Sequence, residues 1–248
     1  MNNLYDDIGI NYSEKRQSDP KIARQIHKKL KGAQRILNIG AGAGSYEPTD
    51  MDLVAVEPSI AMINQRPKTA HPVVQASAEA LPFSNKSFSH ALTILSMHHW
   101  TNRDKAFKEI NRVTTDHFIA VSWNPEAAPF WLTRDYFPEI IKMDRQIFPK
   151  VSELESYFEK VSVEPLLIPD NCMDGFLAAY WKRPGAYLEQ SVRNSISSFA
   201  KLENPEPGLA LLKSDLDNGN WESKNVNILE QSSIDAGYVI ISAYIKNS

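Results

Sequence analysis

The amino-acid sequence predicts an α/β fold in which strands and helices alternate through the first half of the chain. Continuous short apolar runs bounded by polar segments are typical of parallel strands that are buried on both faces. Such runs predict five strands, at residues 36–39, 53–56, 73–74, 91–95 and 118–121. Residues 22–30 and 104–113 place their apolar side chains on one stripe, which predicts an amphipathic helix in each segment.

The second half of the chain differs in composition. Residues 124 to about 227 are rich in aromatic side chains and helix-like segments, and residues 166–168 predict a short strand among them. The apolar run at 238–244 predicts a terminal strand that returns to the sheet, so the aromatic stretch is expected to be a helical insertion before the last strands. We therefore expect a single domain over residues 1–248, with an N-terminal lid and helix (1–33), a core (34–123), the insertion (about 124–227, including the late strand) and the terminal strand (236–246).

Composition and charge narrow the class of function. The 248 residues carry a formal net charge of −3, without the basic excess typical of nucleic-acid-binding proteins, which argues against a nucleic-acid partner. The single cysteine, Cys172, cannot form a disulfide within the chain. The first residues lack the pattern of a signal peptide and no apolar run approaches the ~18 residues of a membrane span, so we expect a cytoplasmic protein with no membrane contact. The six histidines are scattered without metal-ligand spacing, so no metal is expected.

A glycine-rich turn directly follows the first predicted strand. Residues 38–44 read Asn-Ile-Gly-Ala-Gly-Ala-Gly, and the glycines at 40, 42 and 44 let the backbone turn sharply and approach a ligand closely. Ligands of open α/β sheets bind beyond the carboxyl ends of the strands, where this turn is expected to lie. By itself the motif is also compatible with a turn that binds nothing.

An acidic residue, Glu57, ends the second predicted strand. A carboxylate at this position can accept hydrogen bonds from both hydroxyls of a ribose, although Glu57 could also be an exposed charge at the start of a helix, since Pro58 and Ser59 follow it. A nicotinamide-dependent oxidoreductase shares these features. Its fingerprint needs glycines at i, i+2 and i+5, whereas the third glycine here is at i+4 and position 45 is serine, so the spacing argues against it.

Five ordered segments between residues 35 and 123 carry a resemblance to a known family. They are the glycine motif at 38–44, residues 56–59 with Met62, residues 75–83 with Phe88, residues 96–100, and residues 106–113 leading into the strand that ends at Trp123. With these segments in this order, the chain resembles the class I S-adenosylmethionine-dependent methyltransferases, in particular the methyltransferase type 11 group.

The resemblance implies a Rossmann-like methyltransferase fold, which is a doubly wound, mostly parallel, seven-stranded sheet. It implies methyl transfer from S-adenosylmethionine to an unidentified small molecule, with S-adenosylhomocysteine as the product. The glycines would pass the methionine part of the cofactor, Glu57 would hold the ribose, Ala78 and Glu79 would flank the adenine, and Ser96 and Met97 would lie beside the sulfonium. The full set of implied cofactor-binding residues is Asn38, Gly40, Ala41, Gly42, Gly44, Glu57, Pro58, Ser59, Met62, Ser77, Ala78, Glu79, Ser96, Met97 and, from the N-terminal lid, Tyr12.

Three features depart from the family pattern. Most relatives carry Asp or Glu at the position of Asn38, and many carry Asp at the position of Ser77. An asparagine offers an amide oxygen but no charge, so a non-catalytic S-adenosylmethionine-binding protein is a further alternative. The link between Gly44 and Asp52 is too short for the helix that usually joins the first two strands, and we expect a loop there.

Two histidines follow the fourth predicted strand. His98 and His99 could supply a general base, and because adjacent side chains point in different directions we expect only one of them to face the site. In the alternative interpretation, one caps the following helix and the other packs. Aromatic residues that could line the substrate pocket, or simply pack in the core, are Trp100, Trp123, Phe130, Trp131 and Tyr180. The sequence does not indicate the methyl acceptor or the oligomeric state.

Overall fold

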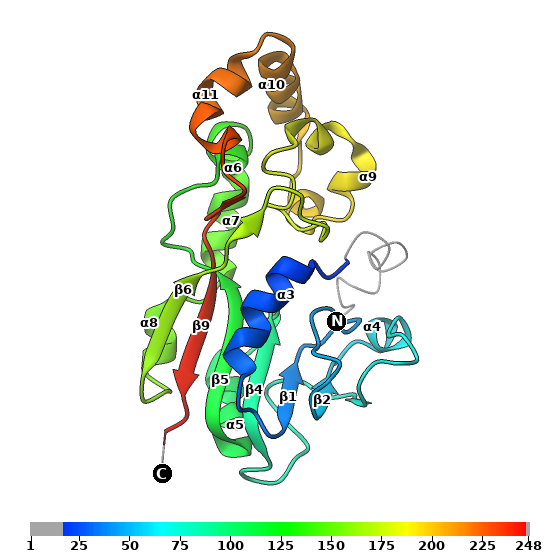
Figure 1. The fold of residues 1–248 in the computed structure, drawn as a ribbon, viewed down its shortest axis with the longest axis vertical. Coiled ribbons are helices and arrows are strands. Elements are labelled where there is room, and N and C mark those ends of the chain that lie inside the picture. Colours follow the sequence, from blue (N-terminus) through cyan, green and yellow to red (C-terminus); the bar gives the residue numbers. More distant parts are fainter. Residues whose placement is uncertain (1–16, 247–248) are drawn as a thin grey trace.

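The computed structural model describes residues 17–246, so the predicted cofactor contact at Tyr12 lies outside the described residues. Seven strands form one sheet in the order β3-β2-β1-β4-β5-β9-β6 (Figure 1). They are β1 (Ile36–Ile39), β2 (Leu53–Val56), β3 (Val73–Val74), β4 (Phe88–Ile94), β5 (Thr114–Trp123), β6 (Val161–Pro165) and β9 (Tyr238–Tyr244). The strands from β1 to β5 pair in parallel, whereas β9 is antiparallel to both β5 and β6. This confirms the predicted doubly wound, mostly parallel sheet and the return of the terminal strand to it.

The late strand is not where the sequence predicted it. Residues 166–168 were expected to form a strand, but β6 ends at Pro165 and Leu166 lies in the connection to β7 (Ile168–Pro169), which pairs with β8 (Ser233–Ile234) in a separate two-stranded sheet. The reason is that β6 lies at the edge of the large sheet and is mostly exposed, so it has no apolar run to reveal it.

The two predicted helices of the first half are present. Helix α3 (Pro20–His27) begins at Asp19, whose Oδ1 accepts hydrogen bonds from the backbone N–H groups of Lys21 and Ile22, and it continues as the 3₁₀ turn η2 (Lys28–Leu30). Helix α5 (Arg103–Val113) is capped by the side chain of Asn102. Between β2 and β3, the short helix α4 (Ile60–Asn64) is capped by Ser59.

Helices cover both faces of the sheet, and strand β5 shows how. Phe118 and Ala120 pack in one apolar cluster with α5, whereas Ile119 and Val121 pack in the other cluster with α3. This alternation follows from the two-residue repeat of side-chain direction along a strand. The link between β1 and β2 contains turns and no helix, as its length predicted.

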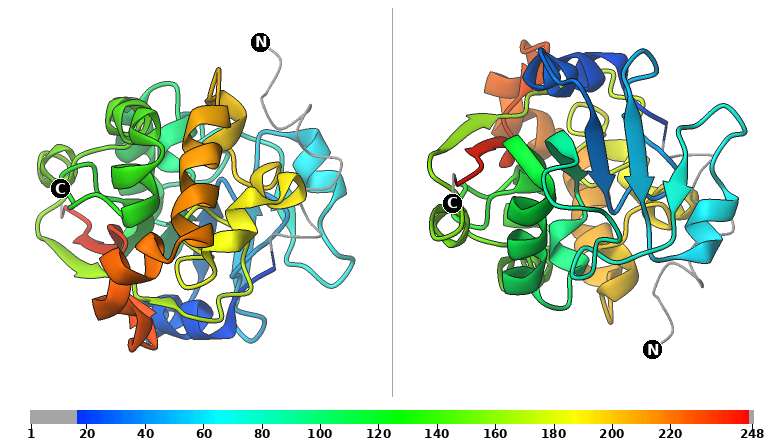
Figure 2. Two further views of the ribbon diagram at one scale, coloured as in Figure 1. Left: turned by 90° about the horizontal axis from the view of Figure 1, so that it is seen from above. Right: turned by 90° about the horizontal axis from the view of Figure 1, so that it is seen from below.

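The insertion lies beyond the carboxyl ends of the parallel strands. Its helical elements are α6 (Trp131–Asp135), α7 (Pro138–Ile147), α8 (Val151–Glu155), η4 (Pro184–Leu188), α9 (Gln190–Arg193), η5 (Phe199–Lys201), α10 (Glu206–Asp217) and α11 (Asn220–Leu229). Helix α8 contacts β6, whereas α6, α7 and the elements from η4 to α11 stand over the end of the sheet (Figures 1 and 2). None of the helices in residues 17–246 combines the length and apolar character needed to span a bilayer.

Candidate active site

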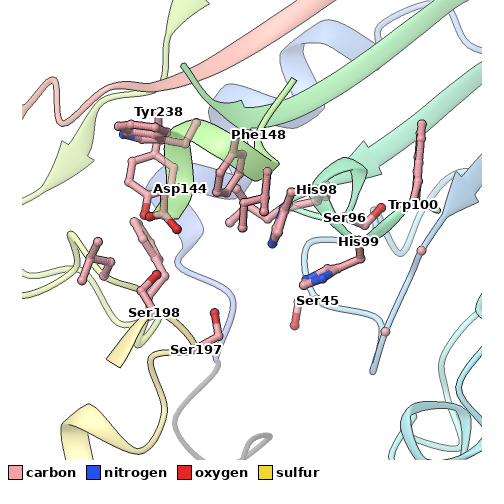
Figure 3. Close-up of a pocket in the computed structure, with 18 of the residues that line it drawn as sticks. Ser45, Ser96, His98, His99, Trp100, Asp144, Phe148, Ser197, Ser198 and Tyr238 are labelled. Carbon is pink, nitrogen blue, oxygen red and sulfur yellow. The ribbon is translucent and has the colours of Figure 1, made fainter. Parts of the chain in front are cut away.

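A cavity of about 520 Å³ lies between the carboxyl ends of β1, β2 and β4 and the insertion (Figure 3). It brings together most of the residues that the sequence singled out. The predicted site residues in its wall are Asn38, Gly40, Ala41, Gly42, Glu57, Pro58, Met62, Ser77, Ala78, Glu79, Ser96, His98, His99, Trp100, Trp123 and Phe130. Residues from the predicted cofactor end and from the insertion therefore share one space.

The glycine turn folds over the end of β2. The backbone N–H groups of Gly40 and Ala41 donate to the carbonyl oxygen of Val56 at 2.9 and 3.0 Å. Gly40 has φ +68°, and a Cβ atom there would lie 2.3 Å from Oγ of Ser96. Only glycine fits this position, because a side chain would be strained by the backbone and would collide with the side chain of Ser96.

Glu57 fixes the shape of this turn. Its Oε2 accepts from the N–H of Gly42 at 2.8 Å and its Oε1 accepts from the N–H of Ser59 at 2.9 Å. The residue is 7 % exposed, so it is not the exposed helix-start charge of the alternative interpretation. Burial raises the pKa of its carboxyl group, and the two backbone hydrogen bonds oppose that rise. Each carboxylate oxygen keeps a further lone pair for a ligand in the cavity.

Asn38 presents an unsatisfied acceptor at the same end of the cavity. Its Nδ2 donates to Oε1 of Glu47 at 3.0 Å, whereas its buried Oδ1 has no hydrogen-bond partner within residues 17–246. A buried acceptor in a cavity wall is expected to meet a donor from a ligand, since leaving it unpaired is costly. The amino group of S-adenosylmethionine is a donor of this kind.

The loop expected beside the adenine, residues 75–83, is joined by hydrogen bonds to the segment before α5. Glu79 accepts hydrogen bonds at Oε1 from the backbone N–H of Thr101 at 2.8 Å and from that residue's hydroxyl at 3.0 Å. These contacts tie the loop to the segment that begins α5. Ser77 and Ala78 line the cavity beside it.

Strand β4 ends in a strained turn at the centre of the site. Leu95 has φ +51°, which is rare for a residue with a branched side chain, and its N–H donates to the carbonyl of Val121 at 2.9 Å. The hydroxyls of Thr93 and Ser96 lie 2.6 Å apart, beside the carbonyl oxygen of Ile39. Ser96 is thereby held between β1 and β4 at the cavity wall.

Both histidines face the cavity, which corrects the expectation that only one would. They lie on the 3₁₀ turn η3 (Met97–His99), where successive side chains are about 120° apart and two neighbours can reach the same space. The ring of His98 contacts the rings of His99 and Phe148, with centroids 3.8 and 4.2 Å away. Desolvation in the cavity wall lowers the pKa of His99 to about 4 and that of His98 well below its ordinary value, so both rings are neutral at pH 7.

The insertion contributes wall residues that the sequence analysis missed. Asp144 projects from α7 among Ile140, Ile141 and Ile147, and burial raises the pKa of its carboxyl group to about 6. Other missed residues are Tyr46, Leu95, Thr101, Phe148, Phe176, Leu177, Ser197, Ser198, Lys201 and Tyr238. The sequence pattern could have revealed Asp144, because this acidic residue interrupts the apolar stripe of the amphipathic helix α7.

Several predicted residues lie outside the cavity wall. Trp131 is 4 % exposed, donates its indole N–H to the carbonyl of Trp181 and packs inside the insertion, and Tyr180 stacks with the guanidinium of Arg183. Met97 packs with α5 in the core and Ser59 caps α4, whereas Gly44 lies beside Arg66.

The alternative interpretation, in which one histidine caps the following helix, is also excluded, because Asn102 caps α5. Within residues 17–246 no group of acidic, histidine or cysteine side chains is arranged to hold a metal.

Comparisons with known proteins agree with this geometry. The family described as Methyltransferase domain matches residues 37–117. The crystal structure of a putative methyltransferase from an antibiotic biosynthesis pathway of Anabaena variabilis has 32 % sequence identity and a TM-score of 0.81, over 92 % of this chain and 98 % of that chain. The chain belongs to the class I S-adenosylmethionine-dependent methyltransferases. The methyltransferase therefore uses S-adenosylmethionine, and a nicotinamide-dependent oxidoreductase or a non-catalytic binder is not favoured.

One further solved structure shares the fold of this methyltransferase, and one further protein matches part of its sequence. A phosphoethanolamine N-methyltransferase of Haemonchus contortus, in complex with phosphomonomethylethanolamine and S-adenosylhomocysteine, has 17 % identity and a TM-score of 0.53, over 98 % of this chain and 56 % of that chain. An uncharacterised protein of Methanocaldococcus jannaschii is 36 % identical over 97 residues, and the match spans 39 % of either protein.

Proposed function

We propose that this methyltransferase methylates a small, largely apolar molecule that binds at the insertion end of the cavity, in a single domain whose residues 34–123 bind the cofactor. The observation that carries the proposal is the continuity of one cavity from Asn38 and Glu57 to the apolar face of α7. A cofactor at the glycine end would leave the space beside α7 for an acceptor. Pockets of this size and lining typically bind small molecules.

The residues at the glycine end suit the parts of the cofactor. The Glu57 carboxylate would accept from the ribose hydroxyls, the loop of Ser77, Ala78 and Glu79 would contact the adenine, and the Asn38 amide oxygen would accept from the amino group. When bound, S-adenosylmethionine supplies a methyl group activated by a sulfonium. The main task of the protein is then to align the acceptor and exclude water, which is catalysis by proximity.

His98 and His99 are the proposed source of a general base. Their turn directly follows Ser96, and their rings are unprotonated at pH 7, which is the state that a general base requires. A positioned base typically contributes about 10²–10⁴-fold to the rate of a reaction that needs deprotonation of the nucleophile.

Asp144 is the proposed contact for a polar group at the far end of the acceptor. Figure 3 shows Asp144 beside Ser198 and Tyr238, on the other side of the cavity from Ser45 and Ser96. Asp144 is 7 % exposed, and burial raises the pKa of its carboxyl group more than the charge of Lys201 and a hydrogen bond from Ser198 lower it. A buried carboxylate in apolar surroundings is stabilised by a hydrogen-bond donor or a positive charge, so the expected acceptor carries an amino or hydroxyl group away from the atom that is methylated.

Isothermal titration calorimetry with S-adenosylmethionine tests the cofactor site. Wild-type protein should bind, and Glu57→Ala should weaken binding at least about tenfold by removing acceptors of charged hydrogen bonds. The exposed variant Asp50→Asn is the matched control and should bind like wild type. Release of S-adenosylhomocysteine across a panel of small apolar amines and alcohols then tests the transfer. A wild-type protein that does not bind S-adenosylmethionine would contradict the proposal.

A further inference from the structure

A buried ion pair between Arg66 and Glu47 contacts the glycine turn. Arg66, which follows α4, donates from Nη2 to both carboxylate oxygens of Glu47 at 3.0 and 2.8 Å, and both side chains are 4 % exposed. Arg66 also donates from Nη1 to the carbonyl of Gly42 at 3.3 Å. Gly44 leaves room for the pair, because a Cβ atom there would lie 3.2 Å from Nη1 of Arg66.

The ion pair determines which way the amide of Asn38 faces. An ionised carboxylate only accepts hydrogen bonds, so the Asn38 atom 3.0 Å from Oε1 of Glu47 must be the amide nitrogen. The amide oxygen is then turned away from Glu47. It is buried in a residue that lines the cavity and has no partner in the described part of the chain.

We propose that Glu47 and Arg66 are positioning residues that lock Asn38 with its amide oxygen toward the cavity, as the acceptor for the α-amino group of the cofactor. The inference rests on the proposed cofactor placement and adds to it the residues that set the acceptor. The Glu47 carboxylate also polarises the amide, which strengthens the hydrogen bond that Oδ1 accepts. The protonated amino group is thus recognised by a neutral oxygen backed by a buried carboxylate, whose own charge Arg66 compensates.

The arrangement explains why an amide suits position 38. Without Glu47, the two ends of the Asn38 amide would be free to exchange, and the NH₂ group would face a cationic amino group in half of the orientations. A carboxylate holding the nitrogen removes that alternative. Glu47 therefore acts on the cofactor through Asn38 and does not line the cavity itself.

The test compares two ligands that differ only at the amino group. Calorimetry measures the affinity of S-adenosylhomocysteine and of its analogue in which hydrogen replaces the α-amino group. Wild type should prefer S-adenosylhomocysteine by about tenfold, the value of one hydrogen bond to a charged group. Glu47→Gln and Asn38→Ala should each bring the preference close to one, and the double variant should lower it no further. Asp50→Asn, in the same loop, should keep the wild-type preference.

The melting temperature of each variant without ligand separates folding from recognition. Should Glu47→Gln fail to fold, Asn38→Ala still tests the acceptor, since it leaves the Glu47–Arg66 pair intact. The inference about Glu47 and Arg66 would be overturned by a wild type that binds both ligands equally, or by a folded Glu47→Gln that keeps the full preference. Either result would leave the proposed function standing. A wild type that binds neither ligand would contradict the proposed function as well.

Discussion

The phenol hydroxyl of Tyr46 donates a 2.8 Å hydrogen bond to Oδ2 of Asp174, and this contact joins the short link after β1 to the insertion. Both residues are buried, with 5 % and 2 % of their surface exposed. Tyr46 itself has φ +64°, an uncommon conformation for a bulky residue, and its N–H donates to Oγ of Ser18 at 2.7 Å. The glycine turn and the substrate-side wall are thus held together through one side chain.

Replacing this tyrosine should destabilise the fold. Tyr46→Phe removes a donor from a buried carboxylate, which should lower the free energy of unfolding by about 1–3 kcal/mol. Urea denaturation measures the change. Tyr244→Phe, at a side chain that is 43 % exposed, is the control and should leave the unfolding free energy within about 0.5 kcal/mol of wild type. Equal effects of the two substitutions would contradict a structural role for the Tyr46–Asp174 contact.

Two glycine substitutions distinguish the effect of the close contact between position 40 and Ser96 from the effect of backbone strain. Gly40→Ala combines a positive φ with a Cβ atom 2.3 Å from Oγ of Ser96, whereas Gly32→Ala has a positive φ and open space around the new atom. Gly32→Ala should cost about 1–2 kcal/mol of stability from strain alone. Gly40→Ala should cost more and should also abolish measurable S-adenosylmethionine binding. Thermal denaturation and calorimetry check the two effects, and unchanged cofactor affinity in Gly40→Ala would argue against the proposed placement of the cofactor.

The carboxyl group of Asp144 should make stability depend on pH. Burial raises its pKa to about 6 in the folded state, so between about pH 4 and pH 6 the folded protein holds a proton that the unfolded chain releases. Stability should therefore fall as pH rises through this range. At pH 7, Asp144→Asn should be more stable than wild type by up to about 3 kcal/mol, and the difference should vanish below about pH 4.

Urea denaturation at several pH values checks this difference. Asp50→Asn, an exposed carboxylate in the link after β1, should follow the wild-type curve throughout. The same Asp144→Asn variant should lose affinity for the methyl acceptor. A variant that gains no stability at pH 7 would show that Asp144 is compensated by a partner in solution.

The proposed base predicts an unusual pH profile. Because desolvation in the cavity wall lowers the pKa of His99 to about 4 and that of His98 well below its ordinary value, turnover should show no histidine titration near pH 6.5 and should decline only toward about pH 4. The profile is best measured in Asp144→Asn, which removes the carboxyl that titrates near pH 6. Release of S-adenosylhomocysteine, with an acceptor from the panel, reports the rate.

Single substitutions identify which histidine accepts the proton. His98→Gln or His99→Gln should reduce kcat about 10²–10⁴-fold if that ring is the base, with a smaller effect on KM. Turnover that stays within a fewfold of wild type in both variants would exclude a histidine base.

The sequence by itself determined the elements whose signals are local. The apolar runs at 36–39, 53–56 and 238–244 became β1, β2 and β9, because strands buried on both faces need continuous apolar residues. The glycines and Glu57 could be placed together since both follow parallel strands, which end at the same edge of the sheet. An exposed edge strand such as β6 leaves no comparable pattern.

Only the tertiary structure decided which side chains meet. Aromatic composition could not show that Trp131 packs inside the insertion whereas Phe148 faces the cavity, because both are apolar residues on short amphipathic segments. Asn38 in β1 meets Glu47 and Arg66 from two different connections, and Asp144 meets Ser198 and Tyr238, which follow it by 54 and 94 positions. Periodicity records whether a residue is buried, but the identity of its neighbours depends on long-range packing of the insertion over the sheet.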